Sequence, residues 1–535
     1  MLTTPSLAPP SPLPGRGRAW IAGLLLAALA GCANLPSNVV RPVSTALAEP
    51  AQTPLGQLAQ TKRSQAGTKN ESGFKLLDSA EMALSARLAL VDAAQKTLDI
   101  QYYAIHADPT TDVLIERLRA ATARGVRVRI LLDDFNTSGR NAQILHLAFE
   151  KNLQLRLFNP LPGSRGSLVL RILGSLDDVG RIQRRMHNKI FVADNAWGIT
   201  GGRNIGETYF GQGKNTNFVD TDVLAVGPVV RTLSTSFDAY WNSELAYPVQ
   251  SLVSQKELDA LKAPAAGGKP AEATVKPGIL STANAGELPA PPVSVPGFDL
   301  QQLPLTWASA AVLVDKPSKI AADASDTEDA QDTVIDGLLQ LIALAKRDLL
   351  IVSPYFVPGQ RMMDQFAGLR ARGVRVRVLT NSLASNDAPL AHVGYARYRK
   401  ALLEAGIELF EMRSEQSAGV GGLGGSSGGS GGASPSGAGS KASLHSKMVV
   451  MDGRLLVIGS MNLDLRSQLQ NSEVALVVRN IPLAQAATKL IEPTLQTGAY
   501  RVQLVNGQLV WSFPGQPDRT SEPDSSTGLK ILLQL

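Results

Sequence analysis

Two segments of the chain carry the same spacing of histidine, lysine and aspartate. Both read H-x-K-x-x-x-x-D, one from His187 and the other from His445. A glycine bend and an asparagine follow each of them, and the distance from His to Asn is 17 residues in both (204 − 187 and 462 − 445). The 535-residue chain has only 5 His, so two chance occurrences are not expected. The pattern indicates an internal duplication.

A second pair of matching segments supports the duplication. Residues 123–131 and 371–379 are identical except at Ile130, which is replaced by Val378. The copies lie 248 residues apart (371 − 123), close to the 258 that separate the two histidines (445 − 187). In each copy a glycine ends a helix pattern and alternating Val and Arg predict a strand. Strands that alternate with helices predict an α/β fold.

The first half illustrates this pattern. We expect helices over 80–94 and 111–124, and strands over 98–103 and 126–132. Thr110 or Thr111 is a candidate N-cap for the second helix. The arginines of the two R-V-R strands (Arg127, Arg129, Arg375 and Arg377) fit a solvated sheet edge or a lipid-headgroup patch. Asp133 and Asp134 fit a solvated loop, with a catalytic pair as the alternative.

The N-terminus has the composition of an export signal. Arg16 and Arg18 precede an uncharged run over 19–30, whose 12 residues are too few to span a bilayer. The run leads into Leu29-Ala30-Gly31-Cys32, which resembles a bacterial lipobox, and Cys32 is the only Cys in the chain. We expect cleavage and acylation there, which predicts a lipid-anchored, periplasm-facing protein of the bacterial cell envelope. Ala33 favours the outer membrane. The alternative is an ordinary signal peptide with a chance Cys.

Composition divides the chain into six segments. We expect a signal peptide (1–31), a tether (32–70), a first domain (71–254), a Pro/Ala-rich connector (255–325), a second domain (326–500) and a C-terminal extension (501–535). A Gly/Ser-rich insertion, 419–440, interrupts the second domain shortly before His445. It fits an exposed insertion, with a substrate lid as the alternative.

Each repeat unit offers an imidazole, an ammonium group and a carboxamide. Residues i and i+2 of a strand share a face, so each motif His is expected beside its Lys. Two facing units suit a phosphodiester. The lysines neutralise its charge, the asparagines donate hydrogen bonds, and the histidines handle the nucleophile and the proton.

The paired motifs resemble those of the phospholipase D superfamily. Segments 185–189, 201–206, 240–243 and 353–359 are similar to its cardiolipin synthase C-like branch. The resemblance covers roughly residues 74–500. It implies two duplicated α/β/α sandwich domains with mixed sheets, related by a pseudo-twofold axis and sharing one active site.

The resemblance also implies roles for individual residues. One His forms a phosphohistidine and the other is the acid and base. We assign His187 as nucleophile and His445 as acid/base, although the sequence alone does not distinguish them. The remaining candidates are Lys189, Lys447, Asn204 and Asn462 as phosphoryl ligands, Glu207 and Glu473 as groups that orient an imidazole, and Asp194 and Asp452, which complete the motifs and fit a structural role better than a chemical one. No metal or other cofactor is implied.

Three classes of function remain open. The first is a membrane-tethered phosphatidyltransferase that forms cardiolipin from phospholipids, with a hydrolase releasing phosphatidate as its near neighbour. The second is a nuclease of the same superfamily, and the third is a non-catalytic envelope lipoprotein. The expected partners are phospholipids and a membrane surface, not nucleic acid. The net charge of +6, or +4 without the two signal arginines, is modest, whereas a DNA-binding protein more often shows a concentrated basic patch. The oligomeric state is not predicted.

Overall fold

The structure, a computed structural model, describes residues 35–176, 178–260, 297–321, 332–415 and 440–523. The predicted signal peptide, Cys32 and the insertion up to residue 439 lie outside them. Among the described helices, none combines the length and apolar character that a bilayer crossing requires.

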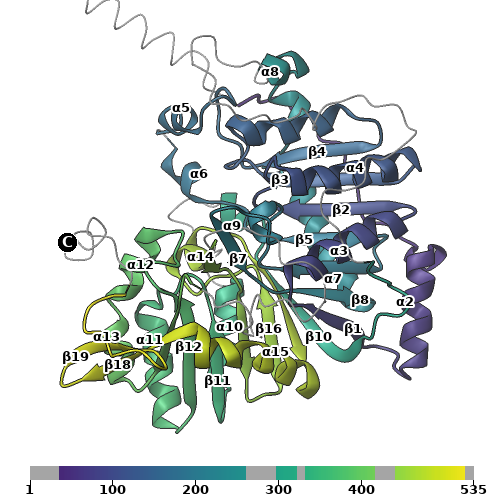
Figure 1. Cartoon of the computed structure of the whole chain (residues 1–535). Coiled ribbons are helices and arrows are strands. Elements are labelled where there is room, and N and C mark those ends of the chain that lie inside the picture. The colour runs from purple at the N-terminus through teal and green to yellow at the C-terminus, as the bar shows by residue number, and fades with distance from the viewer. Residues whose placement is uncertain (1–34, 177, 261–296, 322–331, 416–439, 524–535) are drawn as a thin grey trace, which may run out of the picture.

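A single sheet of 17 strands runs through both halves of the molecule (Figure 1). In the first half its strands are β1 (Ser72–Leu77), β2 (Thr97–Tyr102), β3 (Arg127–Asp133), β4 (Leu153–Phe158), β5 (Ile190–Ala193), β6 (Trp197–Gly201), β8 (Asp222–Val226) and β9 (Ala246–Pro248). In the second half they are β11 (Asp348–Val352), β12 (Arg375–Asn381), β13 (Glu408–Met412), β15 (Met448–Met451), β16 (Leu455–Gly459), β17 (Val474–Arg479), β18 (Ala499–Val505) and β19 (Gln508–Ser512). Strand β10 (Thr306–Val314) joins the halves.

The strand pairing is the same in the two halves. Parallel strands β4-β3-β2 continue through antiparallel β5-β6-β8-β1, and parallel β13-β12-β11 continue through antiparallel β15-β16-β17-β10. Strands β1 and β10 pair with each other between the two sets. This pairing confirms the predicted α/β fold, the mixed sheets and the duplication.

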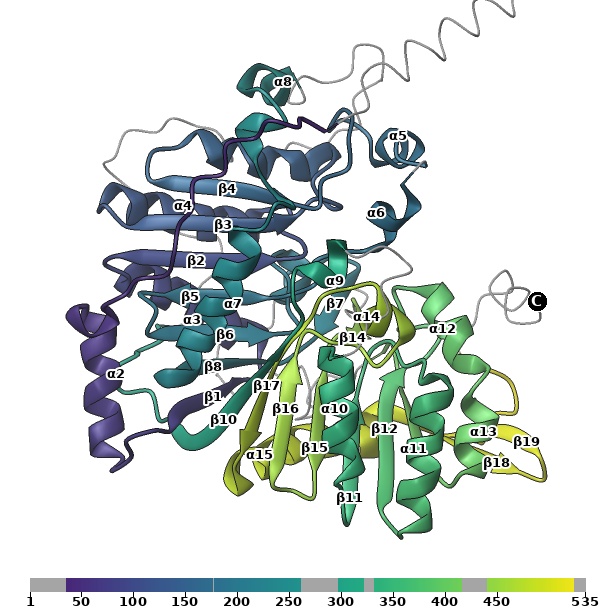
Figure 2. The same cartoon turned by 180° about the vertical axis from the view of Figure 1, so that it is seen from behind.

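Helices cover both faces of this sheet (Figure 2). The first half contains α2 (Pro54–Gln65), α3 (Ala80–Ala93), α4 (Pro109–Ala123), α5 (Leu168–Leu173), α6 (Val179–Gln183), α7 (Pro228–Trp241) and α8 (Gln255–Ala260). The second contains α9 (Ser318–Ala321), α10 (Val334–Ala343), α11 (Gly359–Ala371), α12 (Pro389–Ala396), α13 (Arg399–Glu404), α14 (Leu465–Leu469) and α15 (Ile481–Pro493).

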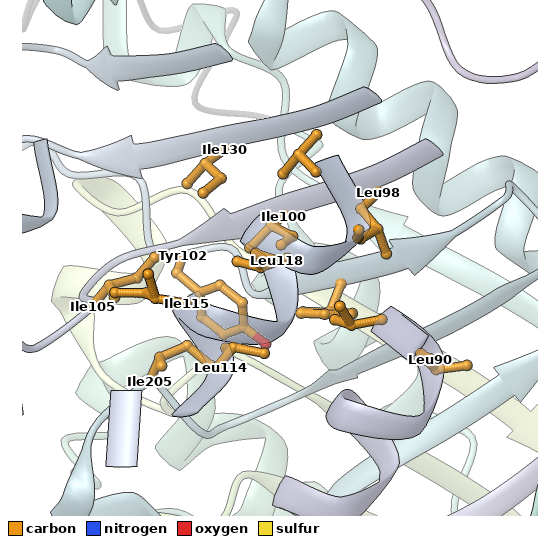
Figure 3. Close-up of a cluster of buried hydrophobic side chains, with 14 of the residues drawn as sticks. Leu90, Leu98, Ile100, Tyr102, Ile105, Leu114, Ile115, Leu118, Ile130 and Ile205 are labelled. Atoms are coloured by element: carbon orange, nitrogen blue, oxygen red, sulfur yellow. The ribbon is translucent and has the colours of Figure 1, made fainter. Parts of the chain in front are cut away.

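Alternation along the strands builds separate cores on the two faces. Leu98, Ile100 and Tyr102 of β2 pack against Leu114 and Leu118 of α4 on one face (Figure 3). On the other face, apolar residues of α7 and α15 share one core with strands of both halves. The two halves are therefore joined by packing as well as by strand pairing.

Four boundary predictions differ from the structure. Asp108, not Thr110 or Thr111, caps α4, because Pro109 occupies its first position and Asp108 Oδ1 accepts from Thr111 N at 2.9 Å. The described part of the expected tether packs on the first half, with Leu55 of α2 buried. The expected connector contains β10, and the expected C-terminal extension supplies most of β18 and all of β19.

The predicted solvation of the strand charges holds for Arg375, which is exposed, but is wrong for Arg129, Asp133 and Asp134. Arg129 is fully buried between Asp99 and Asp238, at 2.7 and 2.8 Å. Asp133 and Asp134 are also buried, Asp133 against Arg185 and Asp134 against Arg165 and Arg171. Their partners lie far away in the sequence, so a local pattern could not reveal them.

Candidate active site

Both motif histidines line one pocket of about 680 Å³ between the halves, together with Asn204 and Asn462. Each His–Lys segment directly precedes a strand, β5 in one half and β15 in the other, rather than lying on it. The expected strand geometry of these residues is therefore wrong, although both His still reach the pocket. The two-stranded sheet of β7 (Thr216–Val219) and β14 (Lys441–Leu444) crosses between the halves beside them.

The carboxylate that orients His187 comes from the other half of the molecule. His187 Nδ1 lies 2.9 Å from Glu473 Oε2. Ser460 Oγ donates to Glu473 Oε2 at 2.5 Å, and Ser467 Oγ donates to Glu473 Oε1 at 2.9 Å. These contacts place Glu473 in the role predicted for it and direct His187 Nε2 away from the carboxylate.

The carboxylate at His445 comes, conversely, from the first half. His445 Nδ1 lies 2.7 Å from Asp220 Oδ2, and both side chains are buried. The prediction of Glu207 for this role is wrong, because Glu207 starts a short 3-10 helix and its backbone N–H donates to Asp108.

Asp220 occupies the position of Glu473 in the duplicated fold. Gly201 pairs with Asp222, and Gly459 pairs with Ala475, so each carboxylate stands two residues before the partner of its bend glycine. In the first half the chain from Asn to carboxylate is longer, 16 residues (220 − 204) against 11 (473 − 462). Strand register could have identified Asp220, but equal spacing from the motif could not.

The two motif lysines are fully enclosed beside the histidines. Lys189 Nζ donates to His187 O at 2.8 Å, and Lys447 Nζ donates to His445 O at 2.6 Å. Burial lowers the pKa of Lys189 to about 7 and that of Lys447 to about 8, with Glu473 and Asp220, respectively, opposing the shift. The lysine charges are available to bind an anion. Without an anion, burial disfavours the charged ammonium groups because they are removed from water.

The two histidines differ in their electrostatic surroundings. Burial, followed by the charges of Lys189 and Lys447, holds the pKa of His187 well below its usual value. Burial and Lys447 also lower the pKa of His445, but the hydrogen bond and charge of Asp220 counteract them. Burial raises the pKa of Glu473, whereas His445 and Lys447 outweigh burial and lower that of Asp220. The environment favours the neutral imidazole more strongly at His187.

The two asparagines have different partners. Asn204 Oδ1 accepts from Ala104 N at 3.3 Å, and Asn204 Nδ2 donates to Tyr209 Oη at 3.0 Å. Asn462 Oδ1 is buried and has no hydrogen-bond partner among the described residues.

The two motif aspartates are structural. The Asp194 carboxylate accepts from the backbone N–H groups of Gln95, Lys96 and Thr97 at 2.8–2.9 Å. The Asp452 carboxylate accepts from those of Lys346, Arg347 and Asp348 at 2.7–3.2 Å. Both have positive φ in the hairpin turn at the far end of β5 or β15, which separates them from the pocket. Both aspartates complete the H-x-K-x-x-x-x-D motifs but fit the structural role expected for them rather than a catalytic one.

Several pocket residues were not predicted. The Tyr103 ring meets His187 edge-on at 5.2 Å, and the Tyr209 ring meets His445 at 5.3 Å. Tyr355 Oη donates to Asp387 at 2.8 Å, and burial raises the pKa of Asp464 to about 6. Further lining residues include Leu390, Leu465 and Arg466. Neither composition nor spacing singles these residues out.

The other three histidines lie outside this lining. His106 stacks on Tyr209 with ring centroids 6.3 Å apart, which puts it behind the pocket. His146 and His392 are buried elsewhere, as expected for histidines without motif partners.

Comparisons with known proteins agree with this arrangement. The family described as "Cardiolipin synthase, PLD-like domain" matches residues 88–241 and 338–494, one stretch in each half. The chain is 35% identical to cardiolipin synthase C of Escherichia coli K12, over 82% of this chain and 89% of that protein. It is 31% identical to an uncharacterized protein of Helicobacter pylori 26695, over 94% and 95% of the two chains.

A solved structure shares the fold. Phosphatidylserine synthase of Haemophilus influenzae superposes with a TM-score of 0.53 at 12% identity, covering 89% of this chain and 96% of that one. Two family matches, each enclosing one histidine motif, account for the duplicated halves. The chain belongs to the cardiolipin synthase-like, PLD-like domain family and is an enzyme of the phospholipase D superfamily.

Proposed function

We propose that this protein is a phosphatidyltransferase that forms cardiolipin from phospholipids through a phosphohistidine intermediate. The observation that carries the proposal is the pair of imidazoles in one pocket, each bonded through Nδ1 to a carboxylate of the opposite half. The 35% identity to a cardiolipin synthase supports the choice of substrate.

In the first step, His187 Nε2 attacks the phosphorus of the donor phospholipid. The bond from phosphorus to the leaving alkoxide breaks, and His445 gives that oxygen its Nε2 proton. The charges of Lys189 and Lys447 stabilise the developing negative charge on the phosphoryl oxygens. The stronger preference for a neutral imidazole at His187 supports its assignment as nucleophile.

In the second step, an alcohol of the acceptor lipid replaces the imidazole. His445 takes the hydroxyl proton, the oxygen attacks phosphorus, and the N–P bond breaks, which regenerates neutral His187. Water in place of the alcohol gives phosphatidate, so hydrolysis is the alternative outcome of the same chemistry.

Lipid analysis tests the proposed reaction. Purified protein is incubated with phosphatidylglycerol, with and without phosphatidylethanolamine, and the products are identified by mass spectrometry. We expect cardiolipin, and none from a His187→Ala control. Phosphatidate alone overturns transfer in favour of hydrolysis. Cleavage of single-stranded DNA without any lipid change favours the nuclease.

Trapping tests the intermediate. His445→Ala lacks the acid of the first step and the base of the second, so the donor is a phosphatidyl ester of p-nitrophenol, whose leaving group needs no proton, labelled in its phosphate. We expect the label to remain on His187, because the second step still lacks its base. The linkage should be labile in acid and stable in base, as for phosphohistidine. Label that persists in His187→Ala contradicts the assigned nucleophile.

We further propose that acylated Cys32 anchors the enzyme to the bacterial envelope, facing the periplasm, with the outer membrane as the favoured site. The lipobox-like sequence supports this proposal. Radiolabelled palmitate should enter the wild-type chain but not Cys32→Ala, and fractionation should release the variant from the membrane. Equal labelling of both overturns acylation at Cys32.

A further inference from the structure

Helix α5 and the turn after it face the protein with polar residues, whereas an ordinary surface helix buries an apolar face. The residues that point inward are polar: Arg171 is fully buried and pairs with Asp134, and its side chain donates to Ser138 Oγ at 2.6 Å. Ser175, also buried, donates to Arg171 O at 2.8 Å. An ion pair, rather than an apolar face, therefore holds this helix in place.

The apolar residues of this segment point away from the protein. Between 49% and 65% of the surface of each remains exposed, in a set that we call the apolar ridge: Val169, Leu170, Leu173, Leu176 and Val179. Single exposed apolar residues are common on soluble proteins, but a cluster on consecutive turns marks an interaction surface.

The apolar ridge lies on the same side of the molecule as the pocket mouth. In Figures 1 and 2, α6 lies between α5 and the part of the second half that carries α14 and α12. At the end of α6, Gln183 accepts from Gln470 Nε2 at 3.3 Å and from Arg466 Nη2 at 3.5 Å. Arg466 and Leu465, both exposed, line the pocket, as does the exposed Leu390 of α12. Polar contacts through Gln183 thus connect the segment of the ridge to the rim of the active site, where Leu390 and Leu465 are exposed.

The charges next to the apolar ridge fit an anionic surface. Arg181 and Arg184 follow the ridge on α6, and Arg466 lies beyond them on the rim. The segment also contains two acidic residues, Asp177 and Asp178, of which Asp178 offsets Arg181 at 2.9 Å. Exposed leucines flanked by arginines are the composition of a segment that rests in the interface of an anionic bilayer.

We propose that the apolar ridge inserts into the interface of an anionic phospholipid bilayer and holds the pocket mouth against it. The ridge and the rim leucines would contact acyl chains at two places, with the arginines between them near the lipid phosphates, while the headgroup enters the pocket. The proposal rests on the proposed function for its choice of a lipid surface, but its test does not depend on catalysis.

The direct test is a local probe of the lipid environment. In the full chain, Cys32→Ser removes the native thiol, and Leu170→Cys takes an NBD label. The matched control is Leu344→Cys. Leu344 is 70% exposed and lies between α10 and the start of β11, near the end of that strand that is away from the pocket. With phosphatidylglycerol–phosphatidylethanolamine vesicles we expect a blue shift at 170, quenched by brominated acyl chains, and none at 344. Equal signals at the two positions overturn the proposal.

A kinetic test uses the double variant Leu170→Glu/Leu173→Glu, with Leu344→Glu as control. Because carboxylates enter the interface poorly, we expect the ratio of turnover on vesicles to turnover on short-chain monomeric phospholipid to fall about tenfold. An unchanged ratio overturns the proposal. The proposal is also overturned if the wild type is a dimer and the double variant is a monomer, because the ridge would then contact a second copy of the chain. If the 170 label enters the bilayer but no phospholipid is turned over, docking stands and the proposed function fails.

Discussion

The carboxylate of Glu473 in the second half lies 2.9 Å from Nδ1 of His187 in the first. Asp220 and His445 repeat this contact in the opposite direction, at 2.7 Å. Each half therefore supplies the imidazole of one pair and the carboxylate of the other. Neither half by itself supplies both members of either of these two pairs, so the active site exists only when both halves pack together.

The first prediction concerns these crossed pairs. Glu473→Gln and Asp220→Asn remove the negative charge but keep the shape, so each imidazole loses the acceptor that sets its tautomer. We expect kcat to fall about 10²- to 10⁴-fold in each variant, with thermal unfolding little changed. Glu207→Gln is the control and should turn over like the wild type. A defect in Glu207→Gln equal to that of Asp220→Asn would contradict the assignment.

The second prediction concerns the two histidines. In the proposed mechanism both act on the same phosphorus, so His187→Ala and His445→Ala should each reduce transfer by about a thousandfold or more. The double variant should be no worse than the more damaged single variant, because residues that act as a unit are not additive. His106→Ala, behind the pocket, is the control. Substantial turnover in either single variant would refute a shared site.

The third prediction is a loss of activity on the alkaline side. The pKa values of Lys189 and Lys447 are lowered to about 7 and about 8, so both lysines lose their protons near neutral pH rather than at their usual pH. A neutral amine does not attract phosphate, so kcat/KM should decline as pH rises from about 7 to about 9.

Replacement of a lysine by arginine separates this effect from others. Lys189→Arg keeps its charge at higher pH, so the decline should move upward in pH, at a lower overall rate because the guanidinium fits the site differently. The measurement is kcat/KM on monomeric phospholipid at constant ionic strength. A flat profile between pH 7 and 9 in the wild type would contradict the lysine assignment.

The fourth prediction separates stability from catalysis. Asp194→Ala leaves three backbone N–H groups without their acceptor in a fully buried turn, and we expect a loss of about 3 kcal/mol in unfolding free energy. Asp452→Ala removes the equivalent contacts from a partly exposed turn and should cost about 1 kcal/mol. Denaturant unfolding measures both losses. Below the unfolding transition both variants should retain kcat within a few-fold, and a catalytic aspartate would not.

The sequence alone was sufficient for the duplicated halves and for the motif histidines and asparagines that meet in one pocket. Two H-x-K spacings with matched asparagines are local patterns, and local patterns report strand and turn periodicity directly. The Asp452-Gly453 pair is typical of a hairpin turn, because a turn with positive φ at two consecutive positions favours these residue types. Glu473 was also identified, as one of two acidic residues that follow the glycine bends.

Other features were decided only by the tertiary structure. Asp220, and not Glu207, orients His445. The first half has a longer chain between its glycine bend and its carboxylate, so the spacing seen in the second half does not locate Asp220. Arg129 is buried because Asp238 of α7, 109 residues away, neutralises it across the packed sheet. Contacts between distant charges depend on which faces meet, and periodicity within one segment carries no information about that.

The joining of the two halves is the clearest such case. The sequence identified two copies of one motif and predicted that they share a site. The pairing of β1 with β10, and the common core under α7 and α15, set which carboxylate meets which imidazole. The motif residues can be recognised from their own segments of the sequence. The crossed pairs arise from the relative placement of the two halves, which long-range packing alone determines.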